Sequence, residues 1–353
     1  MKPSASFSRF TKCLSLVCSA QALTMLLLFS TAAATPLFSQ TLSFSTPERD
    51  STTPISGEYG RVGVGAANIN NELWVAYIGT TTVDGAGDAY VYTANNSNGG
   101  INYGNKSQVT AAYGTVAGNS NPALAYYNGE FYLAYNDGYG NANFVTSSDG
   151  VTWGPEIYSC NRTATKTYTI DASPTMAVFG GVIYVGLRDH TNQEMIICQI
   201  FPGAPSNTNV IEYSSITLNF NPGLGVFNGV LYAAIESNDS SHTIYFYTSS
   251  DGNTWTLQTG ASQDQSSTAP TLAVHNGILY MGFRSNDARD LFFYKYSTDG
   301  VNFTTAIRGN TAVNGNPTLL EATTLTGSPN QGDLYLYWGS DSSPQYLCSD
   351  FAE

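Results

Sequence analysis

Four nine-residue segments decide the fold of this chain: NPALAYYNG at residues 121–129, SPTMAVFGG at 173–181, NPGLGVFNG at 221–229 and APTLAVHNG at 269–277. A further copy begins at Pro317, so prolines 122, 174, 222, 270 and 317 are separated by 52, 48, 48 and 47 residues. An aromatic strand follows each copy, as in FYLAY at 131–135, and a weaker first copy, LWVAY at 73–77, lies 58 residues before its counterpart. The chain therefore contains six copies of one repeat.

A repeat of about 48 residues built only of strands and turns is typical of a β-propeller, in which each repeat is a four-stranded blade around a central channel. In each copy we expect an inner strand after the proline, a hairpin turn at Asn-Gly or its variant, and the aromatic second strand. No Pro/Ser-rich linker interrupts the period, which disfavours an open array or two domains. The predicted fold is all-β: a six-bladed β-propeller of four-stranded antiparallel blades.

A second turn also repeats, as SSDGVTW at 147–153, SSDGNTW at 249–255 and STDGVNF at 297–303, with a degenerate SNGGINY at 97–103. The carboxylates of Asp149, Asp251 and Asp299 can accept hydrogen bonds from nearby backbone N–H groups, and the following glycine supplies a positive φ. We interpret these turns as structural.

The two ends of the chain complement each other. The last copy stops at Ser349–Phe351, where its turn should begin, and therefore lacks an outer strand. Residues Thr41–Ser45 precede the first copy and have strand character. We expect such an N-terminal strand to complete the last blade and close the ring, which also removes an exposed sheet edge.

The first 34 residues differ from the rest. Lys2, Arg9 and Lys12 precede an apolar run, and small residues follow at Ala32–Ala34, which predicts a signal peptide at 1–34 and a single propeller domain at 35–353. The alternative is a membrane anchor, but polar residues interrupt the apolar run, so no membrane insertion of the mature chain is expected. The protein is predicted to be secreted, to the periplasm or the extracellular space.

The composition limits the partners. The 353 residues carry a formal charge of −13, and only 11% of them are charged. Because this acidic excess repels phosphate backbones, nucleic acid is not an expected partner.

Three cysteines, Cys160, Cys198 and Cys348, remain after cleavage, and none forms a CxxC pair. They indicate neither a zinc site nor a disulfide framework, although one bridge could form between any two of them. The three histidines lack metal-ligand spacing, so no cofactor or catalytic metal is predicted. A structural calcium site remains an alternative, because Asp and Asn are frequent in the loops.

The Asp-containing turns on a six-copy propeller resemble the Asp-box repeats of the sialidase superfamily, over essentially the whole mature chain. This resemblance implies a sialidase-like propeller, with two departures. Asp and Gly are adjacent in all three turns, whereas the family usually places one residue between them. The family clamps its substrate carboxylate with three arginines, the first in an Arg-Ile-Pro motif that is absent here. The chain is identified as a divergent relative that could be non-catalytic, and no catalytic residue is assigned.

Candidate ligand residues come from aligning the ends of the second strands. The residue at this position differs in chemical type from one copy to the next, although the surrounding repeat is constant. The loop that follows it lies on the same face of the propeller as the connections between blades. The candidates at this position and in the following loops are Asn136, Asp137, Arg188, Asp189, Glu236, Arg284 and Asp287. Arg188 and Arg284 could clamp a carboxylate or sugar hydroxyls, with Glu236 between them in blade order. The alternative is that these side chains form only surface salt bridges.

The leading hypothesis is a secreted, lectin-like β-propeller whose partner is a glycan or small carbohydrate. The first alternative is an active exo-glycoside hydrolase of sialidase type, in which Glu236 and an aspartate at the mouth act as paired carboxylates. The second is an extracellular protein-interaction scaffold, suggested by the even distribution of tyrosine.

Overall fold

The computed structural model describes residues 48–49, 59–60, 65–69, 72–80, 89–96, 104–109, 120–158, 160, 163, 165–205, 207–259, 264–287, 289–321, 334–339 and 347–352. They belong to one compact unit, Ser43–Glu353. The predicted signal peptide at 1–34 and the predicted closing strand at 41–45 lie outside these residues. Within the described ranges, no helix is long and apolar enough to cross a membrane.

The described strands form six antiparallel sheets, five of four strands and one of five. The first sheet contains β2 (Tyr59–Gly60), β3 (Gly65–Ile69), β4 (Glu72–Thr80), β5 (Ala89–Asn96) and β6 (Gly104–Gln108). The second contains β7 (Ala123–Tyr127), β8 (Glu130–Asn136), β9 (Ala142–Ser147) and β10 (Ile157–Tyr158). The third contains β11 (Thr175–Phe179), β12 (Val182–Arg188), β13 (Glu194–Ile200) and β14 (Thr208–Thr217).

The fourth sheet contains β15 (Gly223–Phe227), β16 (Val230–Glu236), β17 (Ile244–Ser249) and β18 (Thr256–Leu257). The fifth contains β19 (Thr271–His275), β20 (Ile278–Arg284), β21 (Leu291–Ser297) and β22 (Ile307–Ala312). The last contains β23 (Asn314–Glu321), β24 (Leu334–Gly339), β25 (Leu347–Ala352) and β1 (Glu48–Arg49).

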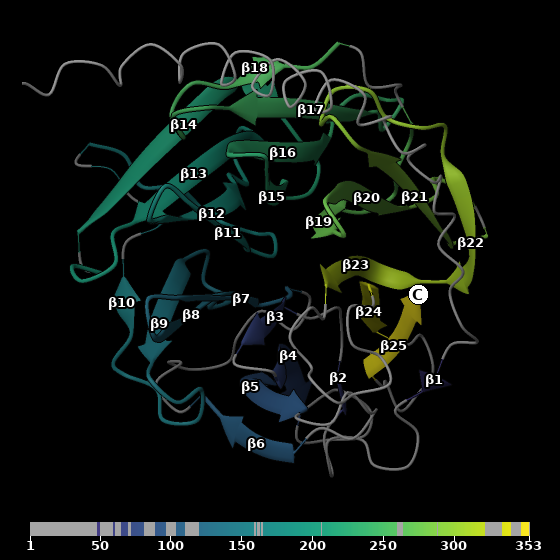
Figure 1. Ribbon diagram of the computed structural model, residues 1–353. Coiled ribbons are helices and arrows are strands. Elements are labelled where there is room, and N and C mark those ends of the chain that lie inside the picture. The colour runs from purple at the N-terminus through teal and green to yellow at the C-terminus, as the bar shows by residue number, and fades with distance from the viewer. Residues whose placement is uncertain are drawn as a thin grey trace, which may run out of the picture. The chain divides into compact units, whose positions relative to one another are not determined.

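The six sheets are arranged as blades around one axis (Figure 1). The inner strands β3, β7, β11, β15, β19 and β23 each contact the next, and β23 contacts β3, so the ring is closed. The predicted six-bladed β-propeller is therefore confirmed.

The last blade is completed from the N-terminal side of the chain, as predicted, but by a different segment. Glu48 and Arg49 of β1 pair with Ser349 and Cys348 of β25. Residues Ser349–Phe351 do not begin a turn, because they pair with Tyr335–Tyr337 of β24 and so extend the third strand.

The inner hairpins follow the predicted turn chemistry. Asn128 and Gly129 have φ values of 54° and 86°, and Asn228 and Gly229 have 49° and 72°. Two successive residues with positive φ make the type I′ turn that matches the twist of the flanking strands.

The core lies between neighbouring blades. The second strands are almost completely buried, and their side chains pack against the next sheet: Tyr132 of β8 belongs to the same apolar cluster as Ile183 and Val185 of β12. Similarly, Trp74 of β4 packs edge-on against Phe131 of β8, with ring centroids 4.8 Å apart. The aromatic repeat position therefore joins adjacent blades.

The Asp-turns are built as their sequence suggests. Asp149 Oδ1 accepts hydrogen bonds from the backbone N–H groups of Thr152 (2.7 Å) and Val151 (2.9 Å), and these bonds lower the pKa of Asp149 to about 2. Equivalent bonds reach Asp251 and Asp299. The glycines of these turns lie against aromatic side chains of the preceding blade, namely Trp74, Tyr184 and Tyr232.

One disulfide joins two elements that the repeat does not connect. Cys160, in the connection between the second and third blades, is bonded to Cys198 of β13, with a Cα–Cα distance of 5.3 Å. From the sequence, any two of the three cysteines Cys160, Cys198 and Cys348 could have formed the bridge.

Candidate functional site

A cavity of about 210 Å³ lies at the axis, where the inner strands begin. Each of the five repeats with a proline contributes the residue that precedes it, and the first repeat contributes Gly65 and Ala66; the five residues are Asn121, Ser173, Asn221, Ala269 and Asn316. Hydrogen bonds link this ring, since the backbone N–H of Asn121 donates to Ser173 Oγ (2.7 Å) and that of Ala269 to Asn316 Oδ1 (3.3 Å). Among the described residues that line the cavity, none is charged. The cavity therefore offers amide, hydroxyl and apolar groups to a small neutral ligand.

The predicted ligand residues share this face of the propeller. Each inner strand begins opposite the end of the second strand, as in the pair Gly223 and Ala234, so strand ends and cavity open to the same side. We call this side the mouth face. Asn136, Arg188, Glu236 and Arg284 all lie on it, but they are not among the residues that line the axial cavity.

Arg188, at the end of β12, is 9% exposed and bound on two sides. Its Nε donates to the carbonyl of Leu218 (2.9 Å), and its Nη1 lies 2.8 Å from both carboxylate oxygens of Asp171. The imidazole Nδ1 of His190 lies 2.6 Å from the same carboxylate. Arg188 is therefore committed to Asp171, which precedes the inner strand of the same blade.

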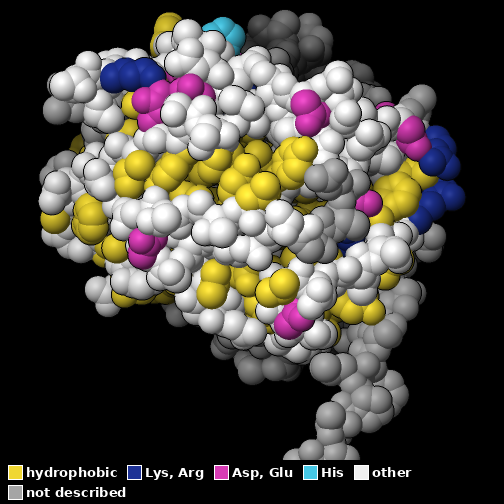
Figure 2. Space-filling model, turned by 90° about the horizontal axis from the view of Figure 1, so that it is seen from above, with side chains coloured by type: hydrophobic (Ala, Val, Ile, Leu, Met, Phe, Trp, Pro, Cys, Tyr) yellow, Lys and Arg dark blue, Asp and Glu magenta, His cyan; other side chains and the backbone are white. Residues whose placement is uncertain are grey.

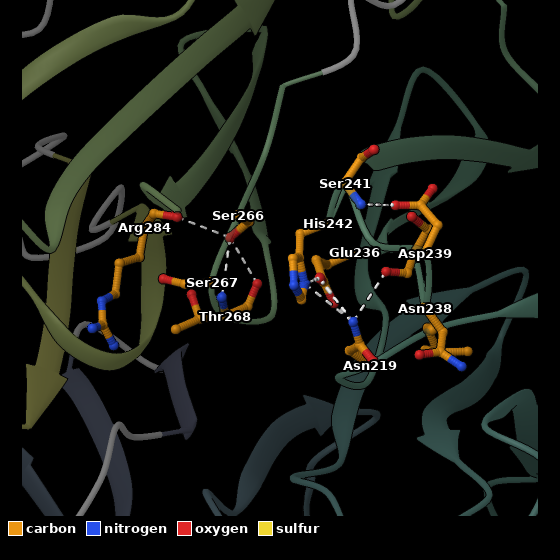
Figure 3. A network of polar contacts seen from close by, with 12 residues as sticks. Asn219, Glu236, Asn238, Asp239, Ser241, His242, Ser266, Ser267, Thr268 and Arg284 are labelled. Atoms are coloured by element: carbon orange, nitrogen blue, oxygen red, sulfur yellow. Dashed lines mark hydrogen bonds and ion pairs between the residues drawn. The ribbon is translucent and has the colours of Figure 1, made fainter. Parts of the chain in front are cut away.

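Glu236, at the end of β16, is fully buried. Its Oε1 accepts a hydrogen bond from Asn219 Nδ2 (3.0 Å) and contacts the imidazole Nδ1 of His242, whereas Oε2 has no partner among the described residues. Burial raises the pKa of Glu236, because it disfavours the charged carboxylate, and the bonds from Asn219 and His242 oppose that rise. Figure 3 shows this cluster, in which the Asn219 amide also reaches the carbonyl of Ser237 (3.1 Å).

Arg284, at the end of β20, forms a third separate group. Its Nε donates to Asp290 Oδ1 (2.9 Å), and its Nη2 contacts the same oxygen. Figure 3 shows its guanidinium pointing away from Glu236, with Ser266–Thr268 between the two. The predicted convergence of Arg188, Glu236 and Arg284 is therefore replaced by three local pairings.

The remaining candidates shape their own loops. Asn136 Nδ2 donates to the carbonyl of Ile170 (2.8 Å), and Asp189 Oδ2 accepts from the backbone N–H of Asn192 (3.0 Å). Hydrogen bonds from the Arg289 guanidinium lower the pKa of Asp287 to about 2.

Asp137 is 6% exposed and accepts bonds from the backbone N–H groups of Tyr139 (2.8 Å) and Asn141 (3.0 Å). Its carboxylate is therefore turned toward its own loop.

Sequence reasoning missed the partners of the strand-end residues. Asp171 and Asn219 occupy one repeat position, three residues before prolines 174 and 222, and each pairs with the strand-end residue of its own blade. Aligning the residues before the prolines as well as those after the second strands would have identified them. His242 and Asp290 lie in loops without a repeat signal.

Charge at the mouth face is compensated locally. Each arginine at a strand end has an aspartate partner. The same pairing of charges is visible away from this face: on the side of the molecule seen in Figure 2, which is turned by 90° from the view along the axis, the basic side chains lie beside acidic ones. Neither Arg188 nor Arg284 is therefore an unpaired guanidinium.

This architecture is the β-propeller of sialidases and neuraminidase-like proteins. A sialidase of Trypanosoma rangeli superposes with a TM-score of 0.57 and 11% identity over 88% of this chain. The match covers 55% of that sialidase, so this chain spans about half its length. A neuraminidase-like protein of subtype N11 from a flat-faced bat influenza virus gives a TM-score of 0.57 at 11% identity, covering 88% of this chain and 93% of that protein.

A protein of unknown function from Dyadobacter fermentans gives a TM-score of 0.64 at 11% identity, covering 84% of this chain and 95% of that protein. No family model matches the sequence, and no curated protein matches it. At this identity the likeness establishes the fold.

Proposed function

We propose that this protein is a secreted, lectin-like β-propeller that binds carbohydrate at its mouth face. The observation that carries the proposal is the axial cavity, which is uncharged where described and to which four of the six repeats contribute an amide or hydroxyl side chain before the proline: Asn121, Ser173, Asn221 and Asn316. Such groups suit sugar hydroxyls, which both donate and accept hydrogen bonds. The structure of Trypanosoma rangeli sialidase in complex with sialic acid supports a glycan as the general class of ligand for this fold.

Binding without catalysis is favoured by the burial and hydrogen bonding of the carboxyl groups at the strand ends. A retaining or inverting glycosidase needs two carboxyl groups that both face the scissile bond. Here Glu236 is fully buried and bonded to Asn219, and the carboxylate of Asp137 holds its own loop. These carboxyl groups therefore have structural partners.

One observation favours the alternative of a glycoside hydrolase. The pKa of Glu236 is raised by burial, as is common for a carboxyl group that acts as a general acid. Under this alternative, Glu236 would protonate a leaving group, and His242, with its side chain 41% exposed, would lie between it and solvent.

Export is supported by the disulfide and by the sequence of residues 1–34. A bridge such as Cys160–Cys198 persists in oxidising compartments. Mass spectrometry of the exported protein should show an N-terminus near Thr35; an intact Met1 on the exported chain would contradict cleavage.

The function is tested with the mature chain, residues 35–353, on a glycan array followed by calorimetric titration of the hits. Saturable binding is expected, and a heat-denatured sample is the control. An empty array with folded protein would contradict the proposal. Release of a chromogenic aryl glycoside that Glu236→Gln abolishes would favour the hydrolase instead.

A further inference from the structure

Tyr139 has the most exposed large hydrophobic side chain among the described residues, at 76%. The next, Val301, is 47% exposed and lies in an Asp-turn on the opposite face. Tyr139 lies in the loop between β8 and β9, on the mouth face. An aromatic ring presented to solvent in this way has no packing role in the blade.

Hydrogen bonds order the backbone of the loop that carries this ring. Asp137 accepts hydrogen bonds from the backbone of Tyr139 and Asn141 and a third from Asn141 Nδ2 (2.6 Å). Gly138 and Gly140, on either side of the tyrosine, have φ values of 76° and 92°, which glycine adopts without strain. The exposed side chain is therefore carried on an ordered backbone, which reduces the entropy lost on binding.

The loop also docks on the connection to the next blade. The backbone N–H of Ile170 donates to the carbonyl of Gly140 (2.8 Å), and a Cβ on Gly140 would lie 2.8 Å from Thr169 Cγ2. The backbone N–H of His190 donates to the carbonyl of Thr169 (2.7 Å). The connection Thr169–Ile170 thus brings the tyrosine loop of the second blade and the His190 loop of the third blade to its two sides.

Polar groups are exposed in and near the His190 loop. The side chain of His190 is 62% exposed, with its Nδ1 beside Asp171, whose side chain is 30% exposed. Arg188 Nη1 holds the same carboxylate, so the orientation of Asp171 is fixed. The exposed aromatic ring and this partly exposed hydrogen-bonding pair are thus carried by loops that bond to the same connection, Thr169–Ile170, and together they supply the two kinds of group needed to recognise a sugar ring.

We propose that Tyr139, Asp171 and His190 form a binding site for a neutral pyranose. The electron-rich face of the tyrosine would stack on the C–H face of the sugar, and Asp171 and His190 would bind its hydroxyls. The inference rests on the proposed function and names the class of glycan. A neutral sugar is favoured because the carboxylate of Asp171 belongs to the site and the Arg188 guanidinium is already paired with it.

The experiment is saturation-transfer NMR and titration with methyl glycosides of neutral hexoses, with sialyllactose as the anionic probe and tetramethylammonium as the cationic probe. For wild-type protein, saturation is expected on the ring C–H protons of a neutral glycoside. Tyr139→Ala should weaken the affinity about tenfold, and Tyr139→Phe should retain it, because the stacking face remains. Val301→Ala is the matched control, since it removes an exposed apolar side chain from the opposite face and should leave the affinity unchanged.

The outcomes separate this site from the general proposal. If wild type binds a neutral glycan and Tyr139→Ala, shown to be folded by its thermal transition, binds equally well, the site is wrong and the lectin function stands. Binding of sialyllactose alone, or of tetramethylammonium in place of sugar, would overturn the assignment of a neutral pyranose. Absence of any glycan binding by wild type would overturn both.

Discussion

Substituting Gly252 by alanine tests whether the Asp-turns hold neighbouring blades together. Gly252 has a φ of +74°, and a Cβ at this position would lie 1.9 Å from Tyr184 Oη and 2.4 Å from Tyr184 Cζ. Tyr184 belongs to β12 of the preceding blade, and its ring is buried. The added methyl group must therefore displace either the turn or the tyrosine.

Two effects set the size of the loss. An alanine in the left-handed region costs about 1–2 kcal/mol. Forcing a packed side chain to move adds about 1–3 kcal/mol. The free energy of unfolding should therefore fall by about 2–5 kcal/mol for Gly252→Ala.

A matched control is available in the neighbouring hairpin. Gly229 has nearly the same φ, +72°, but its Cβ would meet nothing within 4 Å. Gly229→Ala should therefore lose only the backbone part, about 1–2 kcal/mol. Urea denaturation measures the free energy of unfolding of both variants, and the difference between their losses is the steric part of the cost of Gly252→Ala.

Tyr184→Ala supplies the second arm of the test. In that background the steric part should vanish, so Gly252→Ala should cost no more than Gly229→Ala. Equal losses for the two glycine variants in the wild-type background would refute the idea that the turn presses on the next blade.

Three further predictions concern charge. Backbone N–H groups lower the pKa of Asp149 to about 2, so its stabilising contribution should be present above the unfolded pKa of about 3.9 and be lost as the pH falls toward 2. Asp149→Asn should remove this part of the acid denaturation profile, and an unchanged profile would contradict the prediction. Burial raises the pKa of Glu236, so the free energy of unfolding should fall as the pH rises above about 4.3, the pKa in the unfolded chain. In a pH series of urea denaturation curves, Glu236→Gln should flatten this fall. An unchanged slope of the free energy of unfolding against pH would argue against burial of the charge. Arg188→Met removes the guanidinium that is paired with Asp171 and should lower the free energy of unfolding by about 1–3 kcal/mol. Adding Asp171→Asn should restore part of this stability. If the double variant is no more stable than Arg188→Met, the loss is one of packing.

The fold was predictable because its signal is repeated. Prolines 122, 174, 222, 270 and 317 mark the same point in successive blades, so turn chemistry and strand order inferred for one copy apply to the others. The closing strand lacked this support. It is only two residues long, Glu48–Arg49, and so short a strand has no alternation of polar and apolar residues to reveal it.

The mouth face was predictable in position but not in contacts. Alignment placed Arg188 and Glu236 at equivalent strand ends, and the structure confirms that placement. Their partners follow from side-chain direction, which the repeat does not specify: Arg188 turns to Asp171, and Glu236 to Asn219 and His242. Tyr139 gave no sequence signal, because its exposure depends on the way Asp137 folds the loop around it.

The division between axis and strand ends also bears on the charge of the ligand. Near the axis the repeats present neutral groups, such as Asn121, Ser173 and Asn221, whereas the strand ends differ from blade to blade. Where a guanidinium occurs there, as at Arg188, an aspartate is bonded to it within the same blade. An anionic sugar bound by such an arginine would have to compete with that aspartate for charge-assisted hydrogen bonds, which are about twice as strong as neutral ones. A neutral sugar faces no such competition, which is the physical reason for expecting the proposed ligand to be neutral.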